Sequence, residues 1–332
     1  MRVRAARLVR HGEPLIIEEV ELAEPRAGEI VVDMAYAGVN PVDRYVALGR
    51  VAPDAPLPRT LGGEGSATVD GKPVVVRGQG LGTTRDGLWA TKAVVAEAGL
   101  IDVPDGVALD VAGAVGVAGV TAWRTVTELA EVTADDRVLV FGASGGVGST
   151  IVSIAHKIGA TVWGQTGDVD KQSFVAGRGA DRVVVVSLAG ALAGAGSGEA
   201  AAAAERSAVV EELAELRPTV VFDPLGGPYF GAAIEAMAPR GRLVLFGTSA
   251  DATGQVPLQG LYRKSLRVIG YGGLMETDEA IAAGIRATLT AVAEGRLEVC
   301  IDSAIPLDQA NDAFGRLVDR SVRGKLVLDL GS

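Results

Sequence analysis

The alternation of apolar and polar positions changes character near Asp136, and the change predicts two kinds of domain. Beyond this residue, short apolar runs alternate with segments of helical length. The runs cover residues 138–141, 161–166, 182–186, 219–222, 242–246 and 267–270. Strands and helices that alternate in this way are typical of a doubly wound parallel sheet. We therefore expect an α/β domain of the Rossmann type over residues 121–273.

The first hundred residues follow a different pattern, with shorter runs between Gly and Pro turns, which indicates a β-rich domain. The strand candidates are residues 4–10, 15–20, 29–36 and 73–77, and helices are expected at 106–131, 274–295 and 307–318. The last apolar run, 324–330, needs a partner strand, and we place it in the N-terminal sheet. Residues 1–120 and 274–332 would then form one domain. The Ala- and Gly-rich stretch 188–206 is expected to be a surface insertion.

One strand of the second domain runs directly into a turn made of glycines. Residues 138–141 read as a buried strand, and Gly142, Gly145, Gly146 and Gly148 follow before a helix begins. Such a turn points backbone N–H groups and the positive end of a helix dipole at one place, which suits a phosphate. Because glycines carry no side chain, a pyrophosphate can approach the backbone. The turn predicts a dinucleotide site, and the alternative is a glycine-rich connection in an ordinary βαβ unit.

Composition narrows the class of protein. A chain of 332 residues with 48% hydrophobic content can build one large or two medium domains with substantial cores. The net charge of −10 argues against non-specific nucleic-acid binding, because phosphate backbones need cations. The single cysteine, Cys300, excludes an internal disulfide framework and a multi-cysteine zinc site. No signal peptide or bilayer-spanning run is present, so we expect a cytoplasmic protein without a membrane partner.

The ordered motifs of this chain resemble those of the zinc-independent quinone-oxidoreductase branch (ζ-crystallin-like) of the medium-chain dehydrogenase/reductase superfamily. The resemblance extends over nearly the whole length. It rests on blocks at residues 37–45, 61–65, 118–123, 142–148, 179–182, 221–227, 239–247 and 322–328. The resemblance implies a GroES-like β-rich catalytic domain joined to a Rossmann NAD(P)-binding domain. It also implies an oxidoreductase, with a homodimer formed by edge-to-edge pairing of the strand at 265–271.

The same resemblance implies a site without metal. Zinc-dependent relatives carry a Cys near the position of Asn40 and a His–Glu pair where Gly63 and Glu64 stand, and this chain lacks both the Cys and the His. The two histidines of the chain, His11 and His156, cannot complete a zinc ligand sphere in the usual way. Neither of them supports a Ser/His/Asp triad.

The residues near the second strand of the Rossmann domain bear on the choice of cofactor. NAD-preferring folds place an Asp or Glu at the end of this strand, and Thr166 stands there. Lys171 resembles the family's lysine for the 2′-phosphate, so NADPH is expected in preference to NADH. Asp168 argues the other way, because a carboxylate would repel a phosphate unless it turns away. Lys171 could equally be a solvated lysine at the start of a helix.

The resemblance assigns further residues to the cofactor and to the reaction. The cofactor would contact Ser144, Gly145, Gly146, Val147, Gly148, Gly164, Thr166, Lys171, Phe246, Gly247, Thr248, Gly270, Tyr271 and Arg320. The catalytic candidates are Asn40, Tyr45 and Thr121. Arg320 and Lys325 could approach the cofactor or close a domain cleft. Phe246 and Tyr271 could instead be core or interface aromatics, and Tyr45 could simply pack.

Without a metal or a triad, catalysis would depend on positioning and electrostatics. We expect an NADPH-dependent reductase that transfers a hydride to a quinone or another α,β-unsaturated carbonyl compound. One alternative is an enoyl-thioester reductase of lipid or polyketide metabolism. It is weakened because Val51 stands where such reductases have a proton-donating Tyr. Another alternative is a cofactor-binding protein with a non-catalytic role. Trp89 either shapes the substrate mouth or packs within the β domain.

Overall fold

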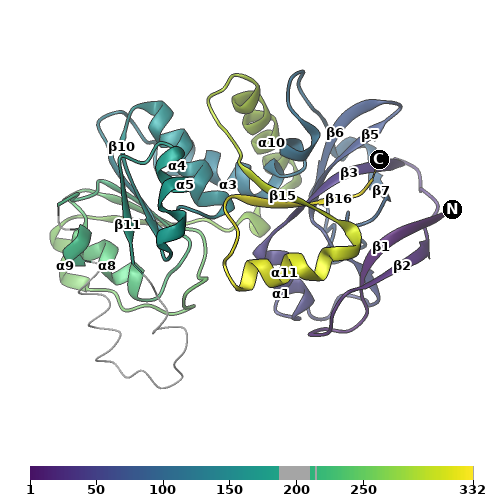
Figure 1. Cartoon of the computed structure of the whole chain (residues 1–332), viewed down its shortest axis with the longest axis horizontal. Coiled ribbons are helices and arrows are strands. Elements are labelled where there is room, and N and C mark those ends of the chain that lie inside the picture. Colours follow the sequence, from purple (N-terminus) through teal and green to yellow (C-terminus); the bar gives the residue numbers. More distant parts are fainter. Residues whose placement is uncertain (187–209, 214, 332) are drawn as a thin grey trace. The chain divides into compact units, whose positions relative to one another are not determined.

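The computed structural model describes residues 1–186, 210–213 and 215–331, and within them the chain divides into two compact units. One unit combines residues 1–121 with residues 275–332, and the other comprises residues 122–274. The expected insertion at 188–206 lies outside the described residues. Both chain termini belong to the first unit (Figure 1). None of the described helices is long and apolar enough to cross a membrane.

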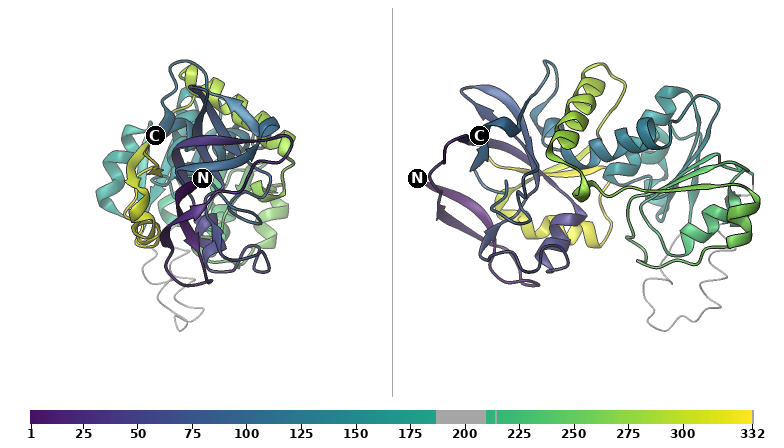
Figure 2. Two further views of the ribbon diagram at one scale, coloured as in Figure 1. Left: turned by 90° about the vertical axis from the view of Figure 1, so that its right-hand side faces the viewer. Right: turned by 180° about the vertical axis from the view of Figure 1, so that it is seen from behind.

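The first unit is built from two sheets. The larger has the order β15-β16-β3-β5-β6-β8, with β7 paired to β3, and the smaller has the order β2-β1-β4. Figure 2 shows the strands of this unit from two further sides. The strands are β1 Arg2–Leu8, β2 Ile16–Glu21, β3 Glu29–Val39, β4 Arg59–Thr60, β5 Glu64–Val69, β6 Lys72–Arg77, β7 Lys92–Ala96, β8 Leu100–Asp102, β15 Ile301–Pro306 and β16 Lys325–Asp329. Strand β16 pairs antiparallel with β3, with Val327 opposite Gly38. This pairing confirms that the last strand returns to the N-terminal sheet.

The helices of this unit are α1 Pro41–Ala47, α2 Leu109–Ala112, α10 Asp278–Ala293 and α11 Ala310–Val318, with short turns η1 Glu97–Gly99 and η6 Leu307–Gln309. Helix α3 Val120–Arg124 and turn η5 Gly273–Met275 lie where the chain passes from one unit to the other. The segment predicted as one helix over 106–131 is instead interrupted by π-helical turns η2 Val115–Gly119 and η3 Thr125–Leu129. A Cβ at Gly119 would lie 2.9 Å from the methyl carbon of Thr288 in α10. The small residues of η2 therefore allow the two helices to approach closely.

Trp89 lies in the apolar core of this unit. Its side chain is fully buried among apolar residues that include Leu8, Met34 and Leu61. The indole N–H donates a hydrogen bond to the carbonyl oxygen of Gly38 at 3.2 Å. A buried indole with a satisfied donor is a packing residue. Of the two alternatives for Trp89, the structure supports packing within the β domain.

The described part of the second unit contains a six-stranded parallel sheet of order β11-β10-β9-β12-β13-β14. Its strands are β9 Arg137–Val140, β10 Thr161–Thr166, β11 Arg182–Val185, β12 Val220–Asp223, β13 Arg242–Leu245 and β14 Arg267–Gly270. Its helices include α4 Gly146–Ile158, α5 Gln172–Gly177, α8 Pro228–Ala236 and α9 Leu258–Arg263, with the turn η4 Val169–Lys171. The order reverses between β9 and β12, which is the switch point where doubly wound sheets bind nucleotides. This confirms the predicted Rossmann fold.

Candidate active and cofactor sites

The glycine turn follows β9 at the switch point of the parallel sheet. Gly142 has a φ of +59°, and the N–H of Gly145 donates to the carbonyl oxygen of Gly142 at 3.0 Å, which closes the turn. Helix α4 begins at Gly146, with Gly145 as an N-cap that has no capping side chain. The N–H groups in the first turn of a helix have no acceptor within the helix, so they are available to an anion.

Steric contacts explain why glycines occupy this turn. A Cβ at Gly148 would lie 2.3 Å from the carbonyl oxygen of Gly142, and one at Gly164 would lie 2.5 Å from a methyl carbon of Val175. At Gly145 the nearest atom would be 3.5 Å away, which is an ordinary contact. Gly148 and Gly164 therefore bring α4 and β10 close to their neighbours, while the side of the turn at Gly145 is open. This open glycine cradle fits a dinucleotide phosphate.

Gln165 is a residue of this site that the sequence analysis did not identify. It is buried in β10, and its side-chain oxygen accepts a hydrogen bond from the N–H of Gly142 at 3.0 Å. Its backbone oxygen accepts from the N–H of Ala143 at 2.8 Å, and its side-chain nitrogen donates to Val186 at 3.0 Å. Gln165 therefore fixes the glycine turn from the neighbouring strand. The available signal was a long polar residue inside an apolar strand.

The end of β10 carries the residues expected to select the cofactor. Thr166 is buried, and its hydroxyl accepts from the N–H of Asp168 at 3.4 Å. The Asp168 carboxylate is exposed and accepts from the N–H of Asp170 at 2.9 Å, so it caps η4. Lys171 is only 6% exposed. This burial argues against the alternative of a solvated lysine at the start of a helix.

The opposite side of the switch point is organised by Asp223, at the end of β12. One of its carboxylate oxygens accepts hydrogen bonds from the N–H groups of Leu225 at 2.7 Å and Gly226 at 2.9 Å. The other carboxylate oxygen is buried without a hydrogen-bond partner among the described residues. Burial raises the pKa of Asp223 to about 6, against the lowering effect of these two hydrogen bonds. The Asp223 backbone oxygen also accepts from the N–H of Phe246 at 3.0 Å.

The remaining cofactor candidates of this unit lie at the ends of β13 and β14. Phe246 and Tyr271 are both half-buried, so neither is a core aromatic. The guanidinium group of Arg124 lies 5.8 Å from the centre of the Tyr271 ring, within the range of a cation–π contact. Thr248 lines a pocket of about 170 Å³ together with Gly226, Leu245 and other residues near the start of α8. Arg320 belongs to the other unit and is exposed there.

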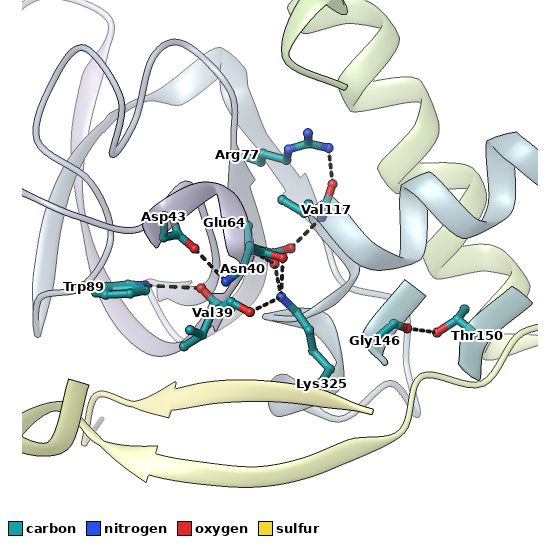
Figure 3. A network of polar contacts seen from close by, with 12 residues as sticks. Val39, Asn40, Asp43, Glu64, Arg77, Trp89, Val117, Gly146, Thr150 and Lys325 are labelled. Carbon is teal, nitrogen blue, oxygen red and sulfur yellow. Dashed lines mark hydrogen bonds and ion pairs between the residues drawn. The ribbon is translucent and has the colours of Figure 1, made fainter. Parts of the chain in front are cut away.

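The catalytic candidate Asn40 lies at the centre of a buried polar network in the first unit (Figure 3). Its side-chain nitrogen donates to Glu64 at 2.7 Å, and its side-chain oxygen accepts from the ammonium group of Lys325 at 2.6 Å. Lys325 also forms a 2.8 Å ion pair with Glu64. The side chains of Lys325 and Glu64 are 4% and 0% exposed. Lys325, one of the two residues that could approach the cofactor or close a domain cleft, is buried in this network.

Local structure explains why Asn40 is held in this place. Asn40 is the N-cap of α1, Pro41 occupies the first helical position, and the backbone N–H of Asn40 donates to the Asp43 carboxylate at 2.8 Å. Burial raises the pKa of Asp43 to about 7, although this hydrogen bond opposes the rise. Tyr45 lies half-buried further along α1. Thr121 is half-buried in α3, which follows η2.

The chain is similar to known dehydrogenases and quinone oxidoreductases. A family model described as zinc-binding dehydrogenase matches residues 197–328. Quinone oxidoreductase 1 of Escherichia coli is 26% identical over 337 residues, covering 96% of this chain and 97% of the relative. These similarities support a quinone-oxidoreductase-like protein of the medium-chain dehydrogenase/reductase superfamily. They also support the expected enzyme class, an NAD(P)H-dependent oxidoreductase.

Two further matches extend over nearly the whole chain. A phenolphthiocerol/phthiocerol polyketide synthase of Mycobacterium tuberculosis is 28% identical over 329 residues, covering 96% of this chain but 14% of the synthase polypeptide. A mycobacterial protein solved in complex with NADPH has a TM-score of 0.81 at 23% identity, covering 98% of this chain and 99% of that chain. This structural match confirms the two-part fold, a GroES-like β-rich unit with a Rossmann unit.

The zinc ion in the description of the family model does not fit the residues around Glu64. One carboxylate oxygen of Glu64 accepts a hydrogen bond from the Asn40 amide nitrogen and forms an ion pair with the Lys325 ammonium group. The other accepts a hydrogen bond from the backbone N–H of Val117 at 2.6 Å. A zinc ion needs several His, Cys or carboxylate ligands. In the described part of the chain, no three such side chains gather into a group that could hold a metal ion. The Glu64 carboxylate is instead neutralised by an ammonium group.

Proposed function

We propose that the chain is an NADPH-dependent, metal-independent reductase that transfers a hydride to a quinone or another α,β-unsaturated carbonyl compound. The observation that carries the proposal is the open glycine cradle at the switch point of the parallel sheet. The other unit adds a buried polar site where Lys325 neutralises Glu64. The similarity to a bacterial quinone oxidoreductase supports the choice of substrate class.

The preference for NADPH rests on the residues after β10. Thr166 cannot accept both ribose hydroxyls as a carboxylate would, and the carboxylate of Asp168 is occupied in capping η4. Lys171 is the cation of this segment that would pair with a 2′-phosphate. The similar mycobacterial protein was solved with NADPH, which supports this assignment. Ser144, Gly145, Gly146 and Val147 would hold the pyrophosphate, and Phe246, Gly247, Thr248 and Gly270 would contact the nicotinamide half.

In the proposed reaction, bound NADPH supplies a hydride to the electrophilic carbon of the acceptor. The chain's own groups then stabilise negative charge on the acceptor oxygen, which is the usual means of catalysis without a metal. Asn40 is held rigidly by two charged partners, and Thr121 and Tyr45 bring hydroxyl groups that can donate hydrogen bonds. The hydroxyl of Tyr45, or water, would provide the proton that completes the reduction.

A second candidate function is reduction of an enoyl thioester, favoured by the 28% identity to one region of a polyketide synthase. Val51, however, packs against the apolar core of the first unit, and its side chain has no acidic proton to donate. An enoyl reductase of this chain would have to obtain its proton elsewhere. Reduction of a quinone or enone is therefore the function that we propose in preference to enoyl-thioester reduction.

We also infer a cytoplasmic homodimer. Strand β14 ends the described sheet of the second unit, and Val268 on it is 43% exposed. An edge strand with exposed apolar side chains is a template for pairing with a second chain.

The test is a steady-state assay of NADPH and NADH oxidation with 1,2-naphthoquinone, a 2-alkenal and crotonyl-CoA. We expect turnover with the quinone or the alkenal and a higher kcat/KM with NADPH. Turnover confined to crotonyl-CoA would support the enoyl-thioester function instead. NADPH binding without turnover of any acceptor would indicate a non-catalytic role. Activity that depends on added zinc would contradict the proposal.

A further inference from the structure

The ammonium group of Lys325 has three N–H donors, and the structure provides three acceptors for them. These are the backbone oxygen of Val39 at 2.9 Å, the side-chain oxygen of Asn40 at 2.6 Å and a carboxylate oxygen of Glu64 at 2.8 Å. Lys325 is 3% exposed and Glu64 is completely buried. Burial makes a charge unfavourable unless it is paired and hydrogen-bonded. The three acceptors therefore favour one position of the Lys325 ammonium group.

We propose that Lys325 is the resident cation of this site: it takes the place of a divalent metal at Glu64 and acts as a positioning residue for the Asn40 amide. The proposal rests on the proposed function in one respect, the assignment of Asn40 to catalysis. The exclusion of metal and the coupling between Lys325 and Glu64 are independent of it. All the residues concerned belong to one unit of the chain.

The two charged partners determine the orientation of the Asn40 amide. Its oxygen faces the ammonium group, and its nitrogen faces the Glu64 carboxylate. A flipped amide would place N–H donors against an ammonium and an oxygen against a carboxylate, and both contacts would be repulsive. Because both ends of the amide are paired with an opposite charge, one orientation is fixed. Neutral partners of similar size would allow both orientations.

Glu64 also fixes the position of the π-helical turn η2. Its second carboxylate oxygen accepts the N–H of Val117 at 2.6 Å, and a Cβ at Gly116 would lie 3.0 Å from that oxygen. Gly38 is closer still, because a Cβ there would lie 2.1 Å from the other carboxylate oxygen of Glu64. Turn η2 leads directly into α3, which carries Thr121. The charge pair therefore sets the positions of the segments that carry Asn40 and Thr121.

The topology brings Lys325 to this place. It is the first residue of β16, whose next residue, Leu326, pairs with Val39 at the end of β3. The N–H of Lys325 donates to the backbone oxygen of Cys300 at 2.8 Å, which fixes the start of the strand. The long side chain of Lys325 then reaches Glu64 at the start of β5. One cation thus joins the ends of three strands of one sheet.

The first experiment compares Lys325→Met with the double variant Glu64→Gln/Lys325→Met. Lys92→Met is the control, because Lys92 forms a more exposed ion pair with Asp33 in the same unit. Loss of the buried partner in Lys325→Met should lower Tm by about 10 °C. The double variant should recover most of this loss because it leaves no unpaired charge. Lys92→Met should change Tm by less than about 2 °C.

The value of kcat distinguishes a positioning role of Lys325 from a purely structural role. In the double variant we expect Tm to recover while kcat with 1,2-naphthoquinone stays about 100-fold below wild type, with the KM for NADPH unchanged, because Asn40 has lost its fixed orientation. Recovery of kcat together with Tm would overturn the positioning role. If Lys325→Met does not fold, Lys325→Ala is measured with added n-propylammonium, which replaces the missing atoms. Recovery of folding with propylammonium, but not with propanol, is expected, and equal recovery with both would contradict the need for a cation.

The second experiment tests the exclusion of metal. Wild-type protein is titrated with Co²⁺, followed by d–d absorption, and its zinc content is measured after growth in zinc-supplemented medium. We expect no visible cobalt bands and much less than one zinc per chain, and one tightly bound zinc per chain would overturn the proposal. Failure of wild-type protein to bind NADPH would defeat the proposed function, while the Tm and metal results would still decide the role of Lys325.

Discussion

The carbonyl oxygen of Gly142 occupies the space that a side chain at Gly148 would need, since a Cβ at Gly148 would lie 2.3 Å from it. At Gly145 the corresponding distance is 3.5 Å, and the φ of this residue, −82°, suits any amino acid. The two glycines of this turn therefore have different roles. Gly148 allows the turn to pack, while Gly145 leaves space beside the backbone.

This difference predicts opposite behaviour of two alanine variants. Gly148→Ala should destabilise the protein by about 3 kcal/mol, because an overpacked contact with backbone cannot relax cheaply. Gly145→Ala should keep Tm within about 2 °C of wild type but weaken NADPH binding at least about tenfold, because a methyl group then stands where the phosphate approaches. Thermal unfolding and fluorescence titration measure the two effects. Unchanged NADPH affinity in Gly145→Ala would remove the turn from the cofactor site.

Lys171 should determine the preference between NADPH and NADH. Removal of a hydrogen-bonded cation from a 2′-phosphate costs about 1.5–3 kcal/mol, so Lys171→Ala should raise the Kd for NADPH about 10- to 100-fold and leave the Kd for NADH unchanged. Lys171 is buried, so Lys171→Met, which keeps the apolar stem, controls for lost packing. Lys157→Ala, a change of an exposed lysine in α4, should affect neither affinity. Equal effects on both cofactors would contradict the phosphate role.

The buried Asp223 should make stability depend on pH. Its folded-state pKa is raised to about 6, above the ordinary value of 3.8, so the folded state holds the proton more tightly than the unfolded state. The stability of wild type relative to Asp223→Asn should therefore fall as the pH rises from about 4 to about 6, by about 3 kcal/mol in all. Below and above this window the difference should be constant. Urea unfolding of both proteins at pH 4, 5, 6 and 7.5 measures it, and a flat difference would contradict the raised pKa.

The Rossmann unit could be predicted from the sequence because its strands are buried on both faces. Such strands are continuous apolar runs, and β9 and β12 consist of Val, Leu and Phe apart from Arg137 and Asp223 at their ends. The glycine turn was equally visible, since close packing demands glycine at fixed spacing. Strand β5 was missed because Glu64, Gly65 and Ser66 give no apolar run. Its burial depends on neighbours such as Met34, which local sequence does not reveal.

The polar network was beyond sequence reasoning for a related reason. Lys325 and Asn40 lie 285 positions apart, and a lysine in an apolar strand gives no indication of its partner. Glu64 was recognised only through the missing zinc ligands beside it. Its pairing with an ammonium group became visible once β16 was placed against β3. Pairing across a sheet between distant strands is a tertiary property, and the two residues show no common periodicity.

Strand β14 should mediate the association of two chains. In the described part of the sheet it pairs only with β13, and Val268 exposes 43% of its surface. A lysine at an exposed edge position opposes edge-to-edge pairing, because two like charges would face each other across the two-fold axis. Val268→Lys should therefore shift the sedimentation coefficient from that of a dimer to that of a monomer, while Met275→Lys, a change of another exposed residue, should leave the dimer intact. Wild-type protein that sediments as a monomer at micromolar concentration would show that this edge stays unpaired in solution.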